Sequence, residues 1–355
     1  MHRILVLNPG STSTKLALYE DKSPLWTESI IYTSERINQF DHVLDQLSMR
    51  EADIKDVFKS KSIKINELSA IAARGGPLKP LESGTYKITS DVVRDIRDGN
   101  VQTEHVSNLS PIIAYDLAHE HNIPAYFVDP VCVDEFEPLA RISGLPEIKR
   151  RSLLHALSVK AVARKAAEKL GKPLNSLNLI VAHLGGGISI CPLKKGRIVD
   201  VNNANEEGPF SPERAGTLPV SSLIRLCYSN KYTEPELRKK IVGQGGLTGY
   251  LQTNDLREVE RRIRAGDDDA EAILQAMAYQ IAKEIGAMST VLHGDVDAIV
   301  VTGGGAYSKI LTDWVTERVR FISEIHILPG DFEMEALALG VLRVLKQEEE
   351  AKVYS

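Results

Sequence analysis

Cysteine is scarce in this sequence. Its 355 residues include only three cysteines, Cys132, Cys191 and Cys227. The number is odd and no two of them have CxxC spacing, which argues against a disulfide framework and against a zinc site. We interpret all three as small buried apolar residues of a protein in a reducing compartment.

Long runs of charged or apolar residues are also missing. Lys and Arg number 43 against 48 Asp and Glu, giving a net charge of −5, and no long basic run is present. Nucleic acid is therefore not an expected partner. No stretch approaches the roughly 18 apolar residues that span a bilayer, and the first residues lack a secretory signal pattern. We expect a cytoplasmic protein without membrane association.

The bulk composition is that of an ordinary globular protein. Apolar residues make up 43% and charged residues 26% of the chain, which argues against disordered and fibrous classes. At roughly 150 residues per domain, the length fits two domains.

Hydrophobic periodicity predicts a first series of strands and helices. Its strands are rich in Val and Ile, and its helices have apolar residues at i, i+3, i+4 and i+7. The predicted strands are Arg3–Asn8, Lys15–Glu20, Leu25–Tyr32, Ala70–Arg74 and Ala125–Asp129, and the helices are Phe40–Met49 and Pro111–Glu120.

A second series follows residue 150 and has a similar order. It begins with a helix over Leu153–Leu170, and residues 233–290 are mostly helical, including the amphipathic segment Ala270–Leu292. The remaining predicted elements are strands Leu179–His183, Gly187–Pro192, Arg197–Val201, Ala298–Thr302 and Glu324–Leu328, and helices Lys309–Phe321 and Met334–Gln347.

The two series share an alignable segment. ILVLNPG at residues 4–10 can be laid on LIVAHLG at residues 179–185. Each has an apolar strand, a polar residue (Asn8 or His183), a spacer and a glycine (Gly10 or Gly185). Such a repeat predicts a duplicated α/β unit, with two domains facing each other across a cleft. Chance similarity between two hairpins is the alternative.

The segment NPGSTSTK at residues 8–15 lies between two predicted strands. Its glycine lets backbone N–H groups approach an anion, its four hydroxyls add donors, and Lys15 adds a positive charge. A simple hairpin with exposed hydroxyls would account for Gly10 but not for the hydroxyl run and Lys15. We therefore predict a phosphoryl-binding hairpin.

Two glycine triplets reinforce this interpretation. Gly185, Gly186 and Gly187 follow one predicted strand, and Gly303, Gly304 and Gly305 follow another. Loops at the carboxyl ends of strands are common phosphate and nucleotide sites. Neither triplet fits GxxxxGK[ST] or GxGxxG. Three such loops in a duplicated fold predict a nucleotide held between two domains.

With these motifs the sequence resembles the acetokinase family of the actin/hexokinase/heat-shock ATPase superfamily, over essentially the whole chain. NPGSTSTK resembles the family's N-x-G-S-[ST]-S-[ST]-K, and AHLGGG at residues 182–187 resembles C-H-L-G-x-G. Length and several motifs are most similar to the butyrate-kinase branch. The resemblance implies an α/β fold of two duplicated actin-like (ribonuclease H-like) domains around a nucleotide cleft.

The resemblance also implies roles for matching residues. ATP or ADP would bind the three loops, through Asn8, Gly10, Ser11, Ser13, Lys15, His183, Gly185, Gly186, Gly187, Gly303, Gly304 and Gly305. Arg74, in AIAARGGP, would bind the substrate carboxylate, for which an Arg fork is suited. A domain-interface ion pair is the alternative for Arg74.

Three further residues have family counterparts. His155 would steady the transferring phosphoryl group, although a histidine beside Leu153, Leu154 and Leu157 is more often a core residue. His105 would lie near the substrate, and helix capping explains its stretch equally well. Asp129 would hold Mg²⁺ or orient the substrate, with a turn as its alternative.

The sequence departs from the family pattern in three places. The family's second substrate Arg is absent after Gly216 and Thr217, and Arg214 is the nearest replacement. Tyr307 occupies the place of the family's metal-site Glu, so Glu333 or Glu335 is a candidate substitute. Gly186 replaces an Asn of the second loop.

The resemblance implies a reversible butyrate kinase that makes butyryl phosphate and ADP from butyrate and ATP with Mg²⁺. Kinases for isobutyrate, propionate or acetate, then a hydroxyl or sugar kinase, then an ATP-driven switch, are the alternatives. We expect domains at residues 1–146 and 147–332, a hinge near Ser143–Pro146, and a final helix at 333–355 that returns to the first domain. We also expect a homo-oligomer, a dimer or larger.

Overall fold

The computed structural model describes residues 1–355 and divides into two compact units. The first comprises Met1–Asp134 and Phe332–Ser355, and the second comprises Glu135–Asp331. The sequence placed the first boundary at residue 146, so the segment predicted as a hinge, Ser143–Pro146, lies inside the second unit. No helix has the length and hydrophobicity needed to cross a membrane.

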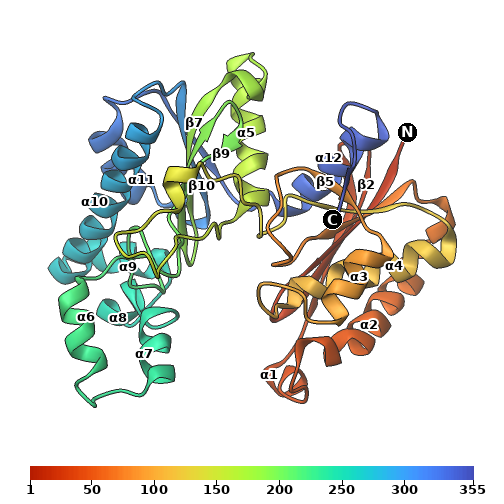
Figure 1. Cartoon of the computed structure of the whole chain (residues 1–355), viewed down its shortest axis with the longest axis horizontal. Helices are drawn as coiled ribbons and strands as arrows, with labels where there is room; N and C mark the ends of the chain where they lie inside the picture. Colours follow the sequence, from red (N-terminus) through yellow and green to blue (C-terminus); the bar gives the residue numbers. More distant parts are fainter. The chain divides into compact units, whose positions relative to one another are not determined.

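The first unit is built on a seven-stranded sheet with the order β12-β5-β6-β4-β1-β2-β3 (Figure 1). β1 is antiparallel to β2 and parallel to β4, which is in turn parallel to β6. The strands are β1 Arg3–Pro9, β2 Ser13–Glu20, β3 Ser23–Ile31, β4 Ala70–Arg74, β5 Thr85–Lys87, β6 Ala125–Val128 and β12 Lys352–Val353.

The second unit has a five-stranded sheet with the order β11-β10-β7-β8-β9. β7 is antiparallel to β8 and parallel to β10, which is parallel to β11. The strands are β7 Asn178–Leu184, β8 Ile188–Lys194, β9 Arg197–Ile198, β10 Ala298–Gly303 and β11 Ile325–Pro329. This order repeats β6-β4-β1-β2-β3 of the first sheet with the same strand directions, so the predicted duplication is confirmed.

Helices cover the sheets. In the first unit they are α1 Ser34–Ile37, α2 Leu47–Ser60, α3 Ser90–Arg97, α4 Leu109–His121 and α12 Glu333–Leu345. In the second they are α5 Ala156–Leu170, α6 Val220–Cys227, α7 Glu234–Ile241, α8 Gly246–Leu251, α9 Leu256–Arg264, α10 Asp268–Val291 and α11 Lys309–Val319. α12, the last helix of the chain, packs against β1, β4 and β6 of the first sheet.

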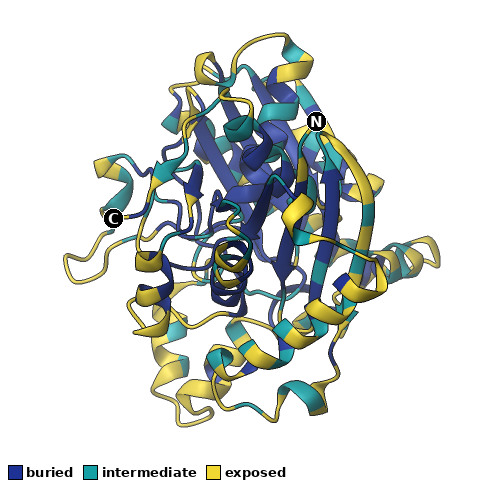
Figure 2. Cartoon of the chain, turned by 90° about the vertical axis from the view of Figure 1, so that its right-hand side faces the viewer, coloured by how far each residue is buried: buried dark blue, intermediate teal, exposed yellow.

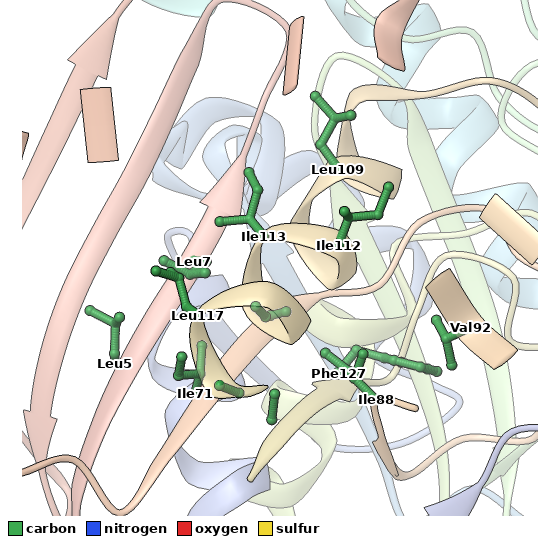
Figure 3. Packing of buried hydrophobic residues seen from close by; sticks show 14 of the residues in the cluster. Leu5, Leu7, Ile71, Ile88, Val92, Leu109, Ile112, Ile113, Leu117 and Phe127 are labelled. Atoms are coloured by element: carbon green, nitrogen blue, oxygen red, sulfur yellow. The ribbon is translucent and has the colours of Figure 1, made fainter. Parts of the chain in front are cut away.

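Each unit has its own apolar core. In the first, Leu109, Ile112, Ile113 and Leu117 of α4 lie against the sheet, where Figure 3 shows them beside strand residues such as Ile71. In the second, α10 buries one face, including Leu274, Ile281 and Ile285. Figure 2 shows most strands buried, apart from the edge strand β3, and the outer faces of the helices exposed.

Most long elements agree with the sequence prediction, and the differences are local. The helix predicted over Phe40–Met49 is largely wrong: Val43–Gln46 forms a 3₁₀ turn with a capping box between His42 and Asp45, and α2 runs from Leu47 to Ser60, so residues 50–60 of this helix were not predicted. The strand predicted over Arg197–Val201 pairs only at its first two residues. The missed elements are short ones, α1, α3, α6, β5 and β12, which fall below the length at which periodicity is informative.

Candidate active site

The hydroxyl-rich hairpin joins β1 to β2. Asn8 pairs with Lys15 in the antiparallel register, and the Gly10 N–H donates to the Ser13 carbonyl at 2.7 Å. Ser11 and Thr12 are exposed, whereas Thr14 is fully buried. The Thr14 hydroxyl accepts hydrogen bonds from Tyr32 and Arg50. Of the four consecutive hydroxyls, Thr14 therefore serves the interior, and the other three remain at the surface of the hairpin.

Arg74 is the last residue of β4 and reaches the end of the neighbouring strand β1. Its Nη1 donates to Asn8 Oδ1 at 3.1 Å and to Glu333 Oε2 at 2.9 Å. Asn8 Nδ2 donates to the same Glu333 oxygen at 2.8 Å. The three side chains form a closed cycle, and Arg74 Nε and Nη2 have no hydrogen-bond partner in it. The structure thus brings two predicted site residues together with Glu333, the first residue of α12.

His105 precedes the 3₁₀ turn Val106–Asn108 and caps it. Its Nδ1 accepts from the Ser107 N–H at 3.2 Å and lies 2.7 Å from the Ser107 hydroxyl. Loss of hydration lowers the pKa of His105, and the positive charge of Arg74 lowers it further. The capping interpretation is therefore observed, and the ring remains close enough to Arg74 to sense its charge.

Asp129 follows β6 and is buried, with a positive φ of 38°. Its Oδ1 accepts from the Gly84 N–H at 2.7 Å. No group of three or more His, Cys, Asp or Glu side chains converges as a metal site anywhere in the chain. A Mg²⁺ ion on a nucleotide needs only one or two protein carboxylates, but Asp129 with an engaged oxygen does not make a preformed site. Magnesium stays a prediction.

In the second unit, His155 and His183 stack on each other. Their ring centroids lie 4.3 Å apart with an interplanar angle of 25°. His155 precedes α5, which begins at Ala156, so it lies at the N-terminus of this helix and not on a leucine-lined face. Its Nδ1 is 3.1 Å from the Ser189 hydroxyl. His183 on β7 pairs with Ser189 on β8, so these two strands contact the His155 ring through neighbouring residues.

Burial controls the protonation of His183. The side chain is buried, and its Nδ1 has no hydrogen-bond partner. Burial lowers the pKa of His183 to about 4, only partly opposed by the negative charge of Asp331. His183 is therefore neutral at pH 7 and offers His155 an uncharged face.

The first glycine triplet lies between β7 and β8, with Arg214 packed on it. A Cβ placed on Gly187 would lie 2.1 Å from Arg214 Nη1, so any larger residue there would require this guanidinium to move. Burial lowers the pKa of Arg214, and the carboxylate of Glu213 opposes this effect. The Ser211 hydroxyl donates to the Gly186 carbonyl and accepts from the Arg214 N–H. The structure thus places Arg214 on the second glycine loop.

The other triplet ends β10 and packs against the end of β7. Gly303 has a φ of 87°, and a Cβ there would lie 2.5 Å from the Leu184 carbonyl oxygen. Because glycine permits this approach, the two triplets lie side by side and border one open pocket of about 670 Å³. The lining includes Gly185, Gly186, Gly304 and Gly305 together with Glu213, Asn254, Asp255, Arg257, Glu260, Tyr307 and Ser308.

Sequence reasoning did not predict the residues around Asn254–Arg257 as part of a pocket. Asp255 caps α9, accepting from the Arg257 N–H at 2.9 Å, so the sequence signal there is only that of a helix start. Glu213 and Glu260 come from different segments of the chain and reach the same pocket through the tertiary fold.

Comparisons with known proteins identify a family and several similar folds. The model of the acetokinase family matches residues 146–327, half of the chain. The structure is similar to acetate kinase from Porphyromonas gingivalis, with a TM-score of 0.80, 21% identity, and coverage of 97% of this chain and 100% of that one.

Two other solved structures are similar. Acetate kinase from Entamoeba histolytica gives a TM-score of 0.76 at 16% identity, covering 97% of this chain and 100% of that one. A propionate kinase from Francisella tularensis subsp. tularensis gives 0.74 at 19% identity, covering 96% and 99%. The fold is the two-domain actin-like ATPase fold. The chain belongs to the acetokinase family, whose members are ATP-dependent carboxylate kinases.

Proposed function

We propose that this protein is a butyrate kinase, which transfers the γ-phosphoryl group of ATP to butyrate and gives butyryl phosphate and ADP, reversibly. The observation that carries the carboxylate acceptor is Arg74, whose Nε and Nη2 donors have no protein partner while Nη1 is held by Asn8 and Glu333. A guanidinium edge with free donors fits a carboxylate in a bidentate way.

The proposed reaction is a direct displacement. A carboxylate oxygen of butyrate attacks the γ-phosphorus, forming the new O–P bond, and the bond from that phosphorus to the β–γ bridging oxygen breaks, leaving ADP. No covalent enzyme intermediate is required, so positioning and electrostatics supply most of the catalysis.

We assign the hairpin to the transferring phosphoryl group. Ser11, Ser13 and Lys15, with the backbone at Gly10, would donate to its oxygens, and Asn8 would link the hairpin to Arg74 through their 3.1 Å hydrogen bond. His155 would steady the equatorial oxygens, with neutral His183 holding its ring. Asp129 would orient the carboxylate side of the site.

We assign the nucleotide to the pocket of the second unit. The triplets at 185–187 and 303–305 would approach the phosphates closely because they carry no side chains. Arg214, held over Gly187, would add a positive charge at this loop, in place of the carboxylate contact expected from the sequence. Magnesium would neutralise phosphate charge when it binds with the nucleotide, and none of these assignments depends on it.

The choice of butyrate over shorter acids rests on the branch resemblance of the sequence. An additional methylene contributes only about 1–3 kcal/mol of discrimination, so activity on isobutyrate, propionate and acetate is also expected. The experiment is hydroxamate trapping of acyl phosphate with Mg-ATP across acetate, propionate, butyrate, isobutyrate and valerate. A maximum with butyrate supports the proposal, whereas a maximum with isobutyrate, propionate or acetate assigns that acid as the substrate instead.

A hydroxyl or sugar kinase is the second candidate. Such an enzyme needs a carboxylate base beside the acceptor hydroxyl, and the end of β1 carries the amide of Asn8, with Glu333 already hydrogen-bonded to Asn8 and Arg74. Phosphorylation of hexoses without any carboxylate would establish this alternative. ATP turnover that is slow and independent of every acceptor would instead indicate a nucleotide switch.

A further inference from the structure

Arg50, on α2, is a buried cation that the proposed reaction does not use. Its side chain is 0% exposed, and burial lowers the pKa of its guanidinium, although the group stays charged at neutral pH. No carboxylate lies within ion-pair distance of it. Burying a charge without an ionic partner costs several kcal/mol unless its donors are well satisfied. Neutral hydrogen-bond acceptors must therefore satisfy its donors.

The guanidinium binds the hydroxyl-rich hairpin from inside. Nη2 lies 3.3 Å from the Ser11 carbonyl oxygen, and Nη1 lies 3.3 Å from the Ser13 carbonyl and 2.9 Å from the Thr14 hydroxyl. Nε and Nη2 also donate to Gln46 Oε1, one turn earlier on the chain. One buried side chain thus connects α2 to the turn of the hairpin.

Tyr32, just after β3, completes this support. Its ring lies under the Arg50 guanidinium at 4.4 Å, and its hydroxyl donates to Thr14 Oγ1 at 3.1 Å. Its N–H donates to the Thr12 carbonyl at 2.9 Å. The carbonyls of Ser11, Thr12 and Ser13 are therefore all bound by Arg50 or Tyr32.

These bonds decide where the hairpin presents its N–H groups. In a planar trans peptide the carbonyl and the following N–H point in opposite directions. Because the Ser11 carbonyl is bound from inside by Arg50, the Thr12 N–H points outward, at an exposed residue. Outward N–H groups and hydroxyls in front of a buried positive charge favour an anion at the surface of the hairpin.

We propose that Arg50 is a positioning residue for the phosphoryl-binding hairpin, which holds the turn at Ser11–Thr14 with its donors outward and adds a positive field behind it. This inference rests on the function proposed for the hairpin. Arg50 itself touches no substrate and acts through Ser11, Ser13 and Thr14.

The test compares Arg50→Ala and Arg50→Lys with Arg36→Ala. Arg36 is a matched control, because its guanidinium also lies near the Tyr32 ring, at 5.5 Å, and pairs with Asp53, but it makes no contact with the hairpin turn. A misplacement of about 1 Å at a reacting group lowers the rate about 100-fold. We expect kcat of Arg50→Ala to fall about 10- to 100-fold while KM for the carboxylate stays within about twofold.

Two readouts separate positioning from a merely structural role. Methylguanidinium should restore part of kcat to Arg50→Ala, whereas Arg36→Ala should keep wild-type kcat. Hydrogen exchange at the amides of residues 10–14 should be faster in Arg50→Ala and slow again with methylguanidinium, whatever the activity. Arg50→Lys, which keeps the charge and loses the fork, should show an intermediate kcat and is the test variant if Arg50→Ala does not fold.

The outcomes distinguish the two proposals. If wild-type protein forms no acyl phosphate, the proposed function fails, and the exchange experiment still decides whether Arg50 orders the hairpin. If the wild type is active but folded Arg50 variants keep wild-type kcat and unchanged exchange at residues 10–14, the assignment of Arg50 is wrong. The assignment would also be overturned if, in the Arg50 variants, KM for the carboxylate rose by the same factor as kcat fell.

Discussion

Arg74 and Glu333 form an ion pair, with Nη1 2.9 Å from Oε2, although 259 residues separate them in the chain. The side chains are 22% and 15% exposed, so the pair is largely withdrawn from water. Both residues also bind Asn8, which fixes the end of β1 to the end of β4 and to the start of α12. α12, the last helix of the chain, therefore contributes Glu333 to the predicted substrate site.

Replacing Arg74 by Lys should weaken the use of the carboxylate. Lysine keeps the charge but is a single point donor, so it cannot hold Asn8 and Glu333 while presenting a fork to the substrate. We expect kcat/KM for butyrate to fall about 100-fold, with KM for ATP little changed. Steady-state kinetics with each substrate varied in turn would measure both effects.

Arg97→Lys is the control for Arg74→Lys. Arg97 is on α3 with its side chain 54% exposed and lies 3.7 Å from Asp116. Replacing it by Lys should therefore leave kcat/KM for butyrate and KM for ATP unchanged. Equal kinetics for the two variants would exclude Arg74 from the carboxylate site.

Replacing Gly187 by Ala should displace Arg214 from the second glycine loop. The new Cβ would start 2.1 Å from Nη1 and 2.5 Å from Cζ, so the guanidinium has to move. We expect kcat/KM for ATP to fall about 10-fold or more and the midpoint of thermal unfolding to drop by a few degrees, since about 1–3 kcal/mol is typical for overpacking.

A double variant tests the cause of that loss. Gly187→Ala combined with Arg214→Ala removes the clash and should recover thermal stability without recovering the ATP kinetics. Recovery of neither property would mean that the Arg214 guanidinium is not what the new methyl group meets.

Protonation of His183 should destabilise the fold at mildly acidic pH. Its folded pKa of about 4 lies below the usual 6.5, so the unfolded chain binds the proton more readily between these values. The contribution of neutral His183 to the free energy of unfolding is complete above about pH 6.5. It is lost as the pH falls toward 4, by on the order of 2–3 kcal/mol.

Urea unfolding at pH 7.5 and pH 5.0 would measure this effect. Because other groups also titrate in this range, the quantity to compare is the pH difference in unfolding free energy between wild type and His183→Asn. We expect a smaller pH difference in the variant, and identical differences would show that His183 is not held neutral.

Replacing Lys160 by Met should destabilise the second unit strongly. Lys160 and Glu135 are 4% and 3% exposed, and Nζ donates to Glu135 Oε2 at 3.1 Å and to the Gly196 carbonyl at 2.6 Å. Removing the cation breaks the ion pair of a buried carboxylate, at a cost of about 3–5 kcal/mol.

The matched partner change should relieve that cost. Glu135→Gln removes the negative charge and keeps an oxygen that can accept from the Ile198 N–H, now 2.8 Å away. We expect the double variant to be clearly more stable to urea than Lys160→Met alone. Equal stability of the two would mean that the charge of Glu135 is compensated by other groups.

Features that depend on neighbouring residues were predictable from the sequence. The strand over Ala70–Arg74 has the predicted bounds, and the two glycine triplets follow strands as expected, because alternation and turn residues act over a few positions. The repeated strand order was predictable from two short aligned segments, since similar local patterns form similar supersecondary structure.

Some details of the site needed the tertiary fold. His155 lies beside leucines in the sequence, which suggests a core residue. Only the structure shows that α5 starts at Ala156 and that His155 stacks on His183. Arg214, the nearest candidate in the sequence for a second substrate cation, lies over the second glycine loop, where its N–H donates to the Ser211 hydroxyl.

The sequence by itself determined the family, the duplicated α/β order and the loops that carry the glycines and hydroxyls, since each is encoded in contiguous residues. The tertiary structure alone decided that Glu333 rather than Glu335 meets Arg74, and that Arg50 lies buried behind the hairpin. Such pairings join residues far apart in the chain. Their energy depends on burial and on distances that no local pattern specifies.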